Sequence, residues 1–174
     1  IMDISQAISY IHNLPKGLKP GLHRITKLLS LLGDPQKELK FVHIAGTNGK
    51  GSTAAMTASI LTCAGYNTGL FTSPFIYRFH ERIQLSGAQI SDEDLLPLIL
   101  KVKALAETME ESPAQFEFVT AVAMEYYRSK KADIVVLEVG MGGALDATNT
   151  IDCPEVAVIT NIGLDHTDAL GSTL

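Results

Sequence analysis

The sequence predicts a doubly wound α/β domain with a mostly parallel sheet. Three observations support this fold class. Segments typical of strands alternate with segments typical of helices after residue 40. Two strand segments, 133–139 and 155–159, are apolar on both faces, which is typical of parallel sheets covered by helices. A glycine-rich segment, 46–53, links a strand to a helix, and ligands of such folds gather at the carboxyl ends of strands.

The first forty residues predict two helices. Apolar residues recur at helical spacing from Ile4 to Ile11 and again from Ile25 to Leu32. The glycine and proline of 33–35 end the second helix. This N-terminal part is therefore expected to pack as helices against the sheet.

The remaining elements follow from apolar runs and capping residues. Ser91, with Asp94 at the third helical position, predicts the start of one helix. Ser112, followed by a proline at the first helical position, predicts the start of the next. The predicted order is strand 41–44, helix 51–64, strands 68–71 and 82–85, the helix after 91, the helix of 113–131, and strands 133–139 and 155–159.

Composition limits the class of protein. The chain has 174 residues, of which 46% are apolar and 19% charged, so one domain with a buried core is expected rather than a disordered chain. It has no run of about 18 apolar residues and no basic tract, so we expect neither a membrane nor a nucleic-acid partner. Cys63 and Cys153 lack metal spacing and are expected to be small buried hydrophobes in a reducing, cytoplasmic compartment.

The glycine-rich segment predicts a phosphate-binding loop. It reads Gly46-Thr47-Asn48-Gly49-Lys50-Gly51-Ser52-Thr53. Glycines let backbone N–H groups approach an anion, and the following helix N-terminus adds partial positive charge. Lys50 is then expected at the β/γ-phosphates of a nucleotide and the Ser52 hydroxyl near Mg²⁺. The spacing departs from the common phosphate-loop pattern, and the alternative is a plain glycine-rich turn.

Polar residues follow three predicted strands. Glu138 is the carboxylate that ends an otherwise apolar strand, and it either binds a metal beside the nucleotide or pairs with a lysine or backbone N–H. His166 follows the last strand, and its spacing fits a structural residue, a general base or a ligand equally well. Ser73 follows strand 68–71, and by itself it is typical of a turn. All three are expected at the same edge of the sheet.

These motifs resemble the folylpolyglutamate and dihydrofolate synthases of the Mur ligase superfamily, which are ATP-dependent amide-forming ligases. The similarity covers nearly the whole chain in order. The matching segments are 21–25, 43–52, 72–74 with 81–83, 138–143 with 145–149, and 160–166.

The resemblance implies roles for the strand-end residues. It implies that Ser73, Glu138 and His166 bind Mg²⁺ and that the phosphate loop binds ATP. Lys50 then joins Glu138 and His166 in the catalytic set.

The resemblance also implies a substrate site. Asp146 and Ala147 match a segment placed near the pterin in dihydrofolate synthases. Arg24 and Arg82 are weaker candidates for substrate or loop contacts, the alternative being ordinary structural arginines.

The implied reaction is the ATP-dependent addition of L-glutamate to a folate, either tetrahydrofolate or dihydropteroate, through an acyl phosphate. The competing interpretations are a cell-wall ligase acting on a UDP-sugar peptide and a non-catalytic nucleotide-binding module. Segments 81–83 and 145–149 favour the folate ligase.

Ligases of this family are much longer than 174 residues. Residues 1–174 are therefore expected to be an N-terminal ATP-binding fragment, with the C-terminal ligase domain absent and little activity alone. An uncovered sheet edge is expected to favour self-association of the fragment.

Overall fold

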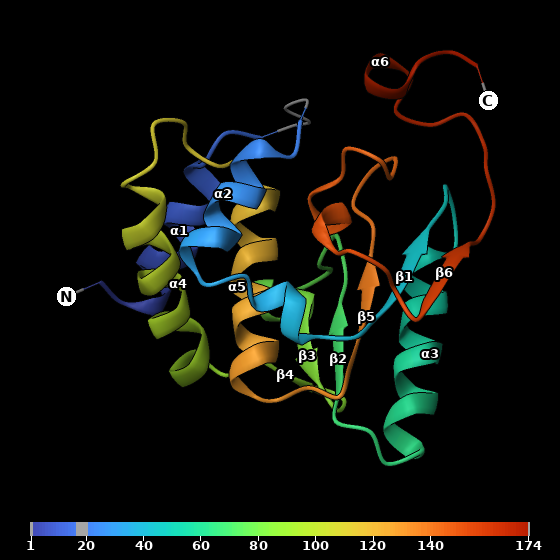
Figure 1. Ribbon diagram of the computed structural model, residues 1–174, viewed down its shortest axis with the longest axis horizontal. Coiled ribbons are helices and arrows are strands. Elements are labelled where there is room, and N and C mark those ends of the chain that lie inside the picture. Colours follow the sequence, from blue (N-terminus) through green and yellow to red (C-terminus); the bar gives the residue numbers. More distant parts are fainter. Residues whose placement is uncertain (1, 17–20, 174) are drawn as a thin grey trace.

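A computed structural model describes residues 2–16 and 21–173. Helices lie on both faces of a six-stranded sheet (Figure 1). The strands are β1 (Phe41–Ala45), β2 (Thr68–Phe71), β3 (Ile83–Leu85), β4 (Ala88–Gln89), β5 (Ile134–Glu138) and β6 (Val156–Ile159). The helices are α1 (Ile4–Asn13), α2 (His23–Leu31), α3 (Lys50–Cys63), α4 (Asp92–Ala106), α5 (Gln115–Ser129) and α6 (Thr167–Leu170), with short 3₁₀ helices η1 (Pro35–Glu38), η2 (Phe79–Arg82) and η3 (Ala147–Thr150).

The sheet is mostly parallel, as the sequence predicts. Its order is β4-β3-β2-β5-β1-β6, and β2, β5, β1 and β6 run parallel to one another. The exceptions are β3 and β4, which form an antiparallel hairpin at the edge beside β2. Strand β4 is not among the elements predicted from the sequence, because two residues are too short to carry a period-2 signal.

The core lies mainly between the sheet and the layer of α1, α2, α4 and α5 (Figure 1). A smaller apolar cluster fills the space between α3 and the other face of the sheet. Helix α5 is almost entirely buried, and the Tyr127 hydroxyl donates a 2.6 Å hydrogen bond to the Leu70 carbonyl of β2. Gly69 allows this close approach, since a Cβ there would lie 2.8 Å from the Tyr127 ring.

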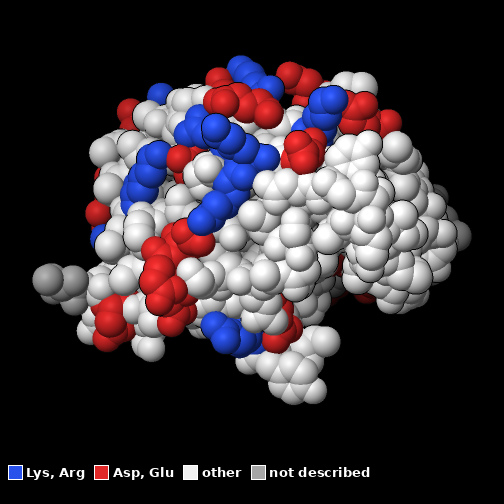
Figure 2. Space-filling view, turned by 90° about the horizontal axis from the view of Figure 1, so that it is seen from below, with Lys and Arg blue, Asp and Glu red and all other residues white. Residues whose placement is uncertain are grey.

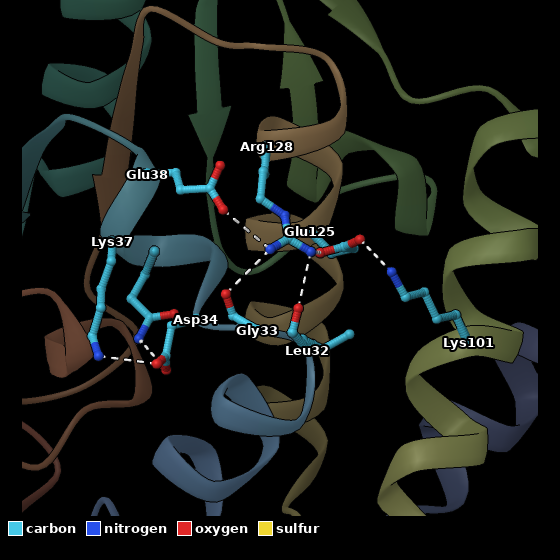
Figure 3. Close-up of polar contacts among 9 residues, drawn as sticks. Leu32, Gly33, Asp34, Lys37, Glu38, Lys101, Glu125 and Arg128 are labelled. Carbon is cyan, nitrogen blue, oxygen red and sulfur yellow. Dashed lines mark hydrogen bonds and ion pairs between the residues drawn. The ribbon is translucent and has the colours of Figure 1, made fainter.

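A polar network ties α5 to the end of α2 and to α4 (Figure 3). The Arg128 guanidinium donates to the carbonyls of Leu32 at 2.9 Å and Gly33 at 3.3 Å, which satisfies free carbonyls at the end of α2. Arg128 also pairs with Glu125, which accepts a 2.6 Å hydrogen bond from Lys101 of α4. These contacts hold three helices of one layer in fixed relation.

The predicted helix starts are right at one position and wrong at another. Ser91 is the N-cap of α4, and its hydroxyl accepts a hydrogen bond from the Asp94 N–H. Helix α5 begins at Gln115 rather than at Pro113, and its N-cap is Ala114 rather than Ser112. The reason is the buried Glu117 carboxylate, which accepts a 2.6 Å hydrogen bond from the Ala114 N–H.

Two expectations about burial are wrong. Cys63 and Cys153 are both exposed rather than buried. Strand β6, expected to be covered on both faces, has Val156 50% and Ile159 66% exposed. It lies at the edge of the sheet and pairs only with β1 among the described strands, so its apolar residues reach the surface.

The surface is divided by charge. On the face drawn in Figure 2, charged side chains gather on the side of the molecule where α4 and α5 lie, whereas the α3 side is nearly free of them. Met56 and Ile60 of α3 are 60% and 69% exposed there. No helix in the described part of the chain has the length and hydropathy needed to cross a bilayer.

Candidate functional site

The phosphate loop, residues 46–53, connects β1 to α3 at the carboxyl end of the sheet. Gly49 is the N-cap of α3 and has a φ of 79°, a left-handed conformation that glycine adopts without strain. The N–H groups of Lys50, Gly51 and Ser52 occupy the first turn and have no intrahelical acceptor. The Lys50 Nζ donates to the Gly46 carbonyl at 2.8 Å and the Thr47 carbonyl at 3.2 Å. The loop therefore presents free backbone donors and one ammonium group, as an anion site requires.

The segment after β6 braces this loop. The Asn48 N–H donates to Asn161 Oδ1 at 2.8 Å, and the Thr47 N–H donates to the Asn161 carbonyl at 2.9 Å. The Thr160 hydroxyl donates to the Asn48 carbonyl at 2.7 Å. Gly46 has a φ of 136°, and a Cβ there would lie 2.1 Å from Thr160 Oγ1. Only glycine allows this close approach.

Glu138 lies at the end of β5, directly behind the loop. Its side chain is 4% exposed, and Oε2 accepts a 2.9 Å hydrogen bond from the Ser73 N–H. The carboxylate also packs against α3, because a Cβ on Gly51 would lie 3.4 Å from Oε1. Burial raises the pKa of Glu138, and the Ser73 N–H and the charges of Lys50 and Arg82 oppose that rise.

The three expected magnesium ligands lie on different elements. Ser73 follows β2 and contacts Glu138 through its backbone N–H. His166 is an exposed residue with a φ of 47° that precedes α6. Within residues 2–16 and 21–173, no three His, Cys, Asp or Glu side chains form a group that could hold a metal ion. The structure thus joins Ser73 to Glu138 and places His166 at the adjoining cavity described next.

A cavity of about 370 Å³ opens beside the Ser73–Glu138 contact. Five of the residues singled out from the sequence line it: Ser73, Arg82, Asp146, Ala147 and His166. The rest of its wall is Pro74, Ala114, Gln115, Phe116, Glu117, Gly140, Met141 and Leu145. The cavity is therefore lined by a guanidinium, carboxylates and apolar side chains, which is typical of a small-molecule site.

Arg82 and Asp146 are held differently in this wall. The Arg82 guanidinium lies 5.2 Å from the centre of the Phe75 ring, and burial lowers the pKa of Arg82 against the attraction of Glu138. Asp146 is 3% exposed, and its Oδ2 accepts a 2.9 Å hydrogen bond from the Met141 N–H. Both side chains are thus fixed by neighbours at the cavity.

Arg24 is placed behind the cavity rather than in it. It is 3% exposed and donates to Glu117 Oε2 at 3.1 Å and to Glu111 Oε1 at 3.1 Å. Because Glu117 lines the cavity, Arg24 supports the wall from the α2 side.

The site residues predicted from the sequence do not include the apolar wall of the cavity, chiefly Phe116, Met141 and Leu145. Phe116 packs on Phe71 with ring centres 5.8 Å apart, and a Cβ on Gly140 would lie 2.7 Å from the Phe116 ring. The glycines of 140–143 were the available signal, because a residue lacking a side chain can mark a close approach.

The chain is similar in sequence to known proteins over nearly its whole length. A family model described as the Mur ligase middle domain matches residues 44–173. The chain is 42% identical to a folylpolyglutamate synthase of Lacticaseibacillus casei, and the alignment covers 99% of this chain and 42% of that protein. It is 45% identical to a dihydrofolate synthase/folylpolyglutamate synthase of Bacillus subtilis, with an alignment over 97% of this chain and 40% of that protein.

Solved structures of similar proteins have the same fold as this chain. An "FPGS-AMPPCP-folate complex" superposes with a TM-score of 0.94 at 42% identity, over 99% of this chain and 43% of that one. An Escherichia coli FolC complex with DHPP and ADP superposes with a TM-score of 0.91 at 36% identity, over 99% and 41%. The chain spans about two fifths of the length of these relatives. The chain belongs to the Mur ligase family, as a middle domain of the folylpolyglutamate and dihydrofolate synthase type.

Proposed function

We propose that the chain is the ATP-binding part of a ligase that joins L-glutamate to a folate, either tetrahydrofolate or dihydropteroate. The observation that carries this proposal is that Ser73 links two sites: it donates to Glu138 behind the phosphate loop and lines the cavity that holds Arg82 and Asp146. The names of the two bacterial relatives support folate and glutamate as substrates. The titles of the solved complexes support a nucleotide and a folate as ligands.

In this proposal the first turn of α3 holds the phosphates of ATP. The free N–H groups of Lys50, Gly51 and Ser52 supply directed donors, and the helix N-terminus adds favourable charge. The Lys50 ammonium leaves the carbonyls of Gly46 and Thr47 and turns to the β/γ-phosphates. Its positive charge offsets the charge that develops on the transferred phosphoryl group.

Glu138 is the residue best suited to hold Mg²⁺ at this site. Mg²⁺ in nucleotide sites is bound by one or two carboxylates together with phosphate oxygens and water. Glu138 offers Oε1 beside the first turn of α3 while Oε2 is held by the Ser73 N–H. Ser73 and His166 complete the proposed set, although an imidazole is an unusual ligand for this ion. The metal would neutralise phosphate charge during transfer.

The proposed reaction has two steps. A substrate carboxylate oxygen attacks the γ-phosphorus of ATP, which forms an acyl phosphate and releases ADP. The amino group of L-glutamate then attacks the acyl carbon, loses a proton and expels phosphate, which leaves an amide. The residues of this chain position the two reactants and stabilise charge, and they form no covalent bond to substrate.

Nucleotide binding by the 174-residue chain tests the first part of the proposal. We expect an ATP analogue to bind in the presence of Mg²⁺ and Lys50→Ala to weaken binding by about 10- to 100-fold, as the loss of charge-assisted hydrogen bonds predicts. Lys27→Ala, an exposed lysine of α2, is the matched control and should change nothing. Equal binding by wild type and Lys50→Ala would refute the assigned role.

Acceptor-dependent ADP release by an enzyme that carries this chain tests the second part. Tetrahydrofolate, dihydropteroate and a UDP-sugar peptide are supplied in turn with ATP, Mg²⁺ and L-glutamate. Release that requires glutamate and a pterin acceptor supports the proposal, whereas release with the UDP-sugar acceptor alone identifies a cell-wall ligase. Nucleotide binding without release in any mixture identifies a non-catalytic module. The 174-residue chain alone is expected to show little ligation.

A further inference from the structure

A hydrogen-bonded series connects β1 to the cavity wall through one half-buried side chain, His43, and two buried ones, Thr148 and Asp146. His43 Nε2 lies 2.8 Å from Thr148 Oγ1, and the Thr148 hydroxyl donates to Asp146 Oδ1 at 2.6 Å. The Thr148 N–H also donates to Oδ1, at 3.0 Å. His43 precedes the phosphate loop by three residues, whereas Thr148 and Asp146 belong to η3 and its N-cap.

The direction of every hydrogen bond in this series is determined by chemistry. A hydroxyl has one proton, and Thr148 gives it to Asp146. His43 Nε2 must therefore carry a hydrogen and donate it to Thr148 Oγ1. Burial lowers the pKa of His43, although the charge of Asp146 opposes this, so the neutral imidazole is favoured. The hydrogen bond to Thr148 then places its hydrogen on Nε2.

The series leaves one acceptor position of Asp146 for a ligand. A carboxylate has about four lone-pair positions. Two on Oδ1 are taken by Thr148, and one on Oδ2 by the Met141 N–H. Asp146 itself lines the cavity, so the fourth position, on Oδ2, is the one left for a ligand there.

We infer that His43 and Thr148 are positioning residues that hold the Asp146 carboxylate ready to accept an N–H hydrogen bond from the acceptor substrate. The inference rests on the proposed function for the nature of that substrate. It assigns no direct substrate contact to His43 or Thr148, because neither lines the cavity. Their effect passes through the orientation of Asp146.

The first test needs no substrate. Long-range ¹H–¹⁵N NMR of the imidazoles in the 174-residue chain identifies which nitrogen of His43 carries hydrogen. We expect the Nε2–H tautomer in the wild type and a weakened preference in Thr148→Val, which removes the acceptor at nearly constant volume. A wild-type His43 with hydrogen on Nδ1 alone would overturn the inference whatever the substrate.

The second test separates positioning from stability. In an enzyme that carries this chain, Thr148→Val should raise the acceptor KM about tenfold, the cost of one hydrogen bond to a charged group, and leave the KM for ATP within about twofold. Thr148→Ser and His43→Gln retain the needed donors and should restore most of the affinity. Thr150→Val is the matched control, because the Thr150 hydroxyl lies in the same short helix but donates to the Ala147 carbonyl rather than to Asp146.

The outcomes distinguish this inference from the proposed function. If the wild type uses no pterin acceptor, the proposed substrate is wrong, while the tautomer of His43 still decides the series. If the wild type uses a pterin acceptor and folded Thr148→Val keeps its KM, the positioning role is wrong. An equal loss in Thr148→Val and Thr148→Ser also contradicts it, because serine keeps the hydroxyl.

Discussion

Replacing Gly46 with alanine perturbs the point where the phosphate loop meets the segment after β6. The new Cβ would lie 2.1 Å from Thr160 Oγ1, 3.0 Å from the Asn161 carbonyl oxygen and 3.1 Å from the Asn161 nitrogen. The φ of 136° also belongs to a region that alanine rarely adopts. The Thr160 side chain must therefore move away, which breaks its 2.7 Å hydrogen bond to the Asn48 carbonyl.

The expected cost has two parts. Backbone strain at a disfavoured φ contributes about 1–3 kcal/mol. The broken hydrogen bond adds about 1 kcal/mol, so the free energy of unfolding should fall by about 2–4 kcal/mol. Because the backbone of Asn161 cannot move without releasing the N–H groups of Asn48 and Thr47, affinity for an ATP analogue should also fall.

Urea denaturation and analogue titration of the 174-residue chain provide the assay. Gly65→Ala is the matched control, because Gly65 has a φ of 94° but a Cβ there meets nothing within 4 Å. Strain alone should then destabilise this variant by about 1–3 kcal/mol, with nucleotide affinity unchanged. Combining Gly46→Ala with Thr160→Ala should cost less than the sum of the two changes. If Gly46→Ala lowers the free energy of unfolding no more than Gly65→Ala and binds nucleotide normally, Thr160 and Asn161 do not brace the loop.

Four further expectations follow. Tyr127→Phe should lower the unfolding free energy by about 1–2 kcal/mol in urea denaturation, because the buried hydrogen bond to the Leu70 carbonyl is lost. Hydrogen bonds from three backbone N–H groups lower the pKa of Glu81. The ionised carboxylate therefore stabilises the fold above the ordinary glutamate pKa, and this contribution is lost as pH falls. Glu81→Gln should speed amide exchange in 76–78 at pH 7. Burial lowers the pKa of His43, so the imidazole takes up a proton more readily in the unfolded chain than in the folded one. As pH falls from 7 to 5, the wild type should therefore lose stability relative to His43→Gln in urea denaturation. The exposed apolar edge at β6 predicts self-association, and Ile159→Lys should reduce it in light scattering.

The parts of the fold that the sequence predicts are those set by local patterns. Continuous apolar runs identify β5 and β6, and a serine hydroxyl identifies the start of α4. The prediction fails where tertiary contacts decide. Ser112 has the side chain of an N-cap, yet α5 begins at Gln115 because the Glu117 carboxylate takes the Ala114 N–H while Arg24 of α2 holds it.

The apolar pattern of a strand also does not determine whether the strand is buried or lies exposed at the edge of the sheet. A run of valine and isoleucine is compatible with a central strand or with an edge strand, because both alternate faces in the same way. Strand β6 differs from β5 in having one neighbouring strand rather than two, which is a property of the sheet order. The exposure of Val156 and Ile159 therefore follows from topology and is not encoded in the segment itself.

In the candidate site, too, local patterns predict some features, and long-range contacts determine others. Residues that follow strands, such as Ser73 and Asp146, reach the cavity because parallel strands bring their carboxyl ends to one edge. The conformation of the phosphate loop has a different origin. Asn48 is held by Asn161, 113 residues away, and by the neighbouring Thr160 hydroxyl. A loop whose glycine spacing departs from the common pattern can still present the α3 N-terminus to a phosphate, because long-range hydrogen bonds supply constraints that its own residues do not. The residues of the loop alone are therefore insufficient to fix its geometry, and changes at Thr160 or Asn161 should impair nucleotide binding although both residues lie outside 46–53.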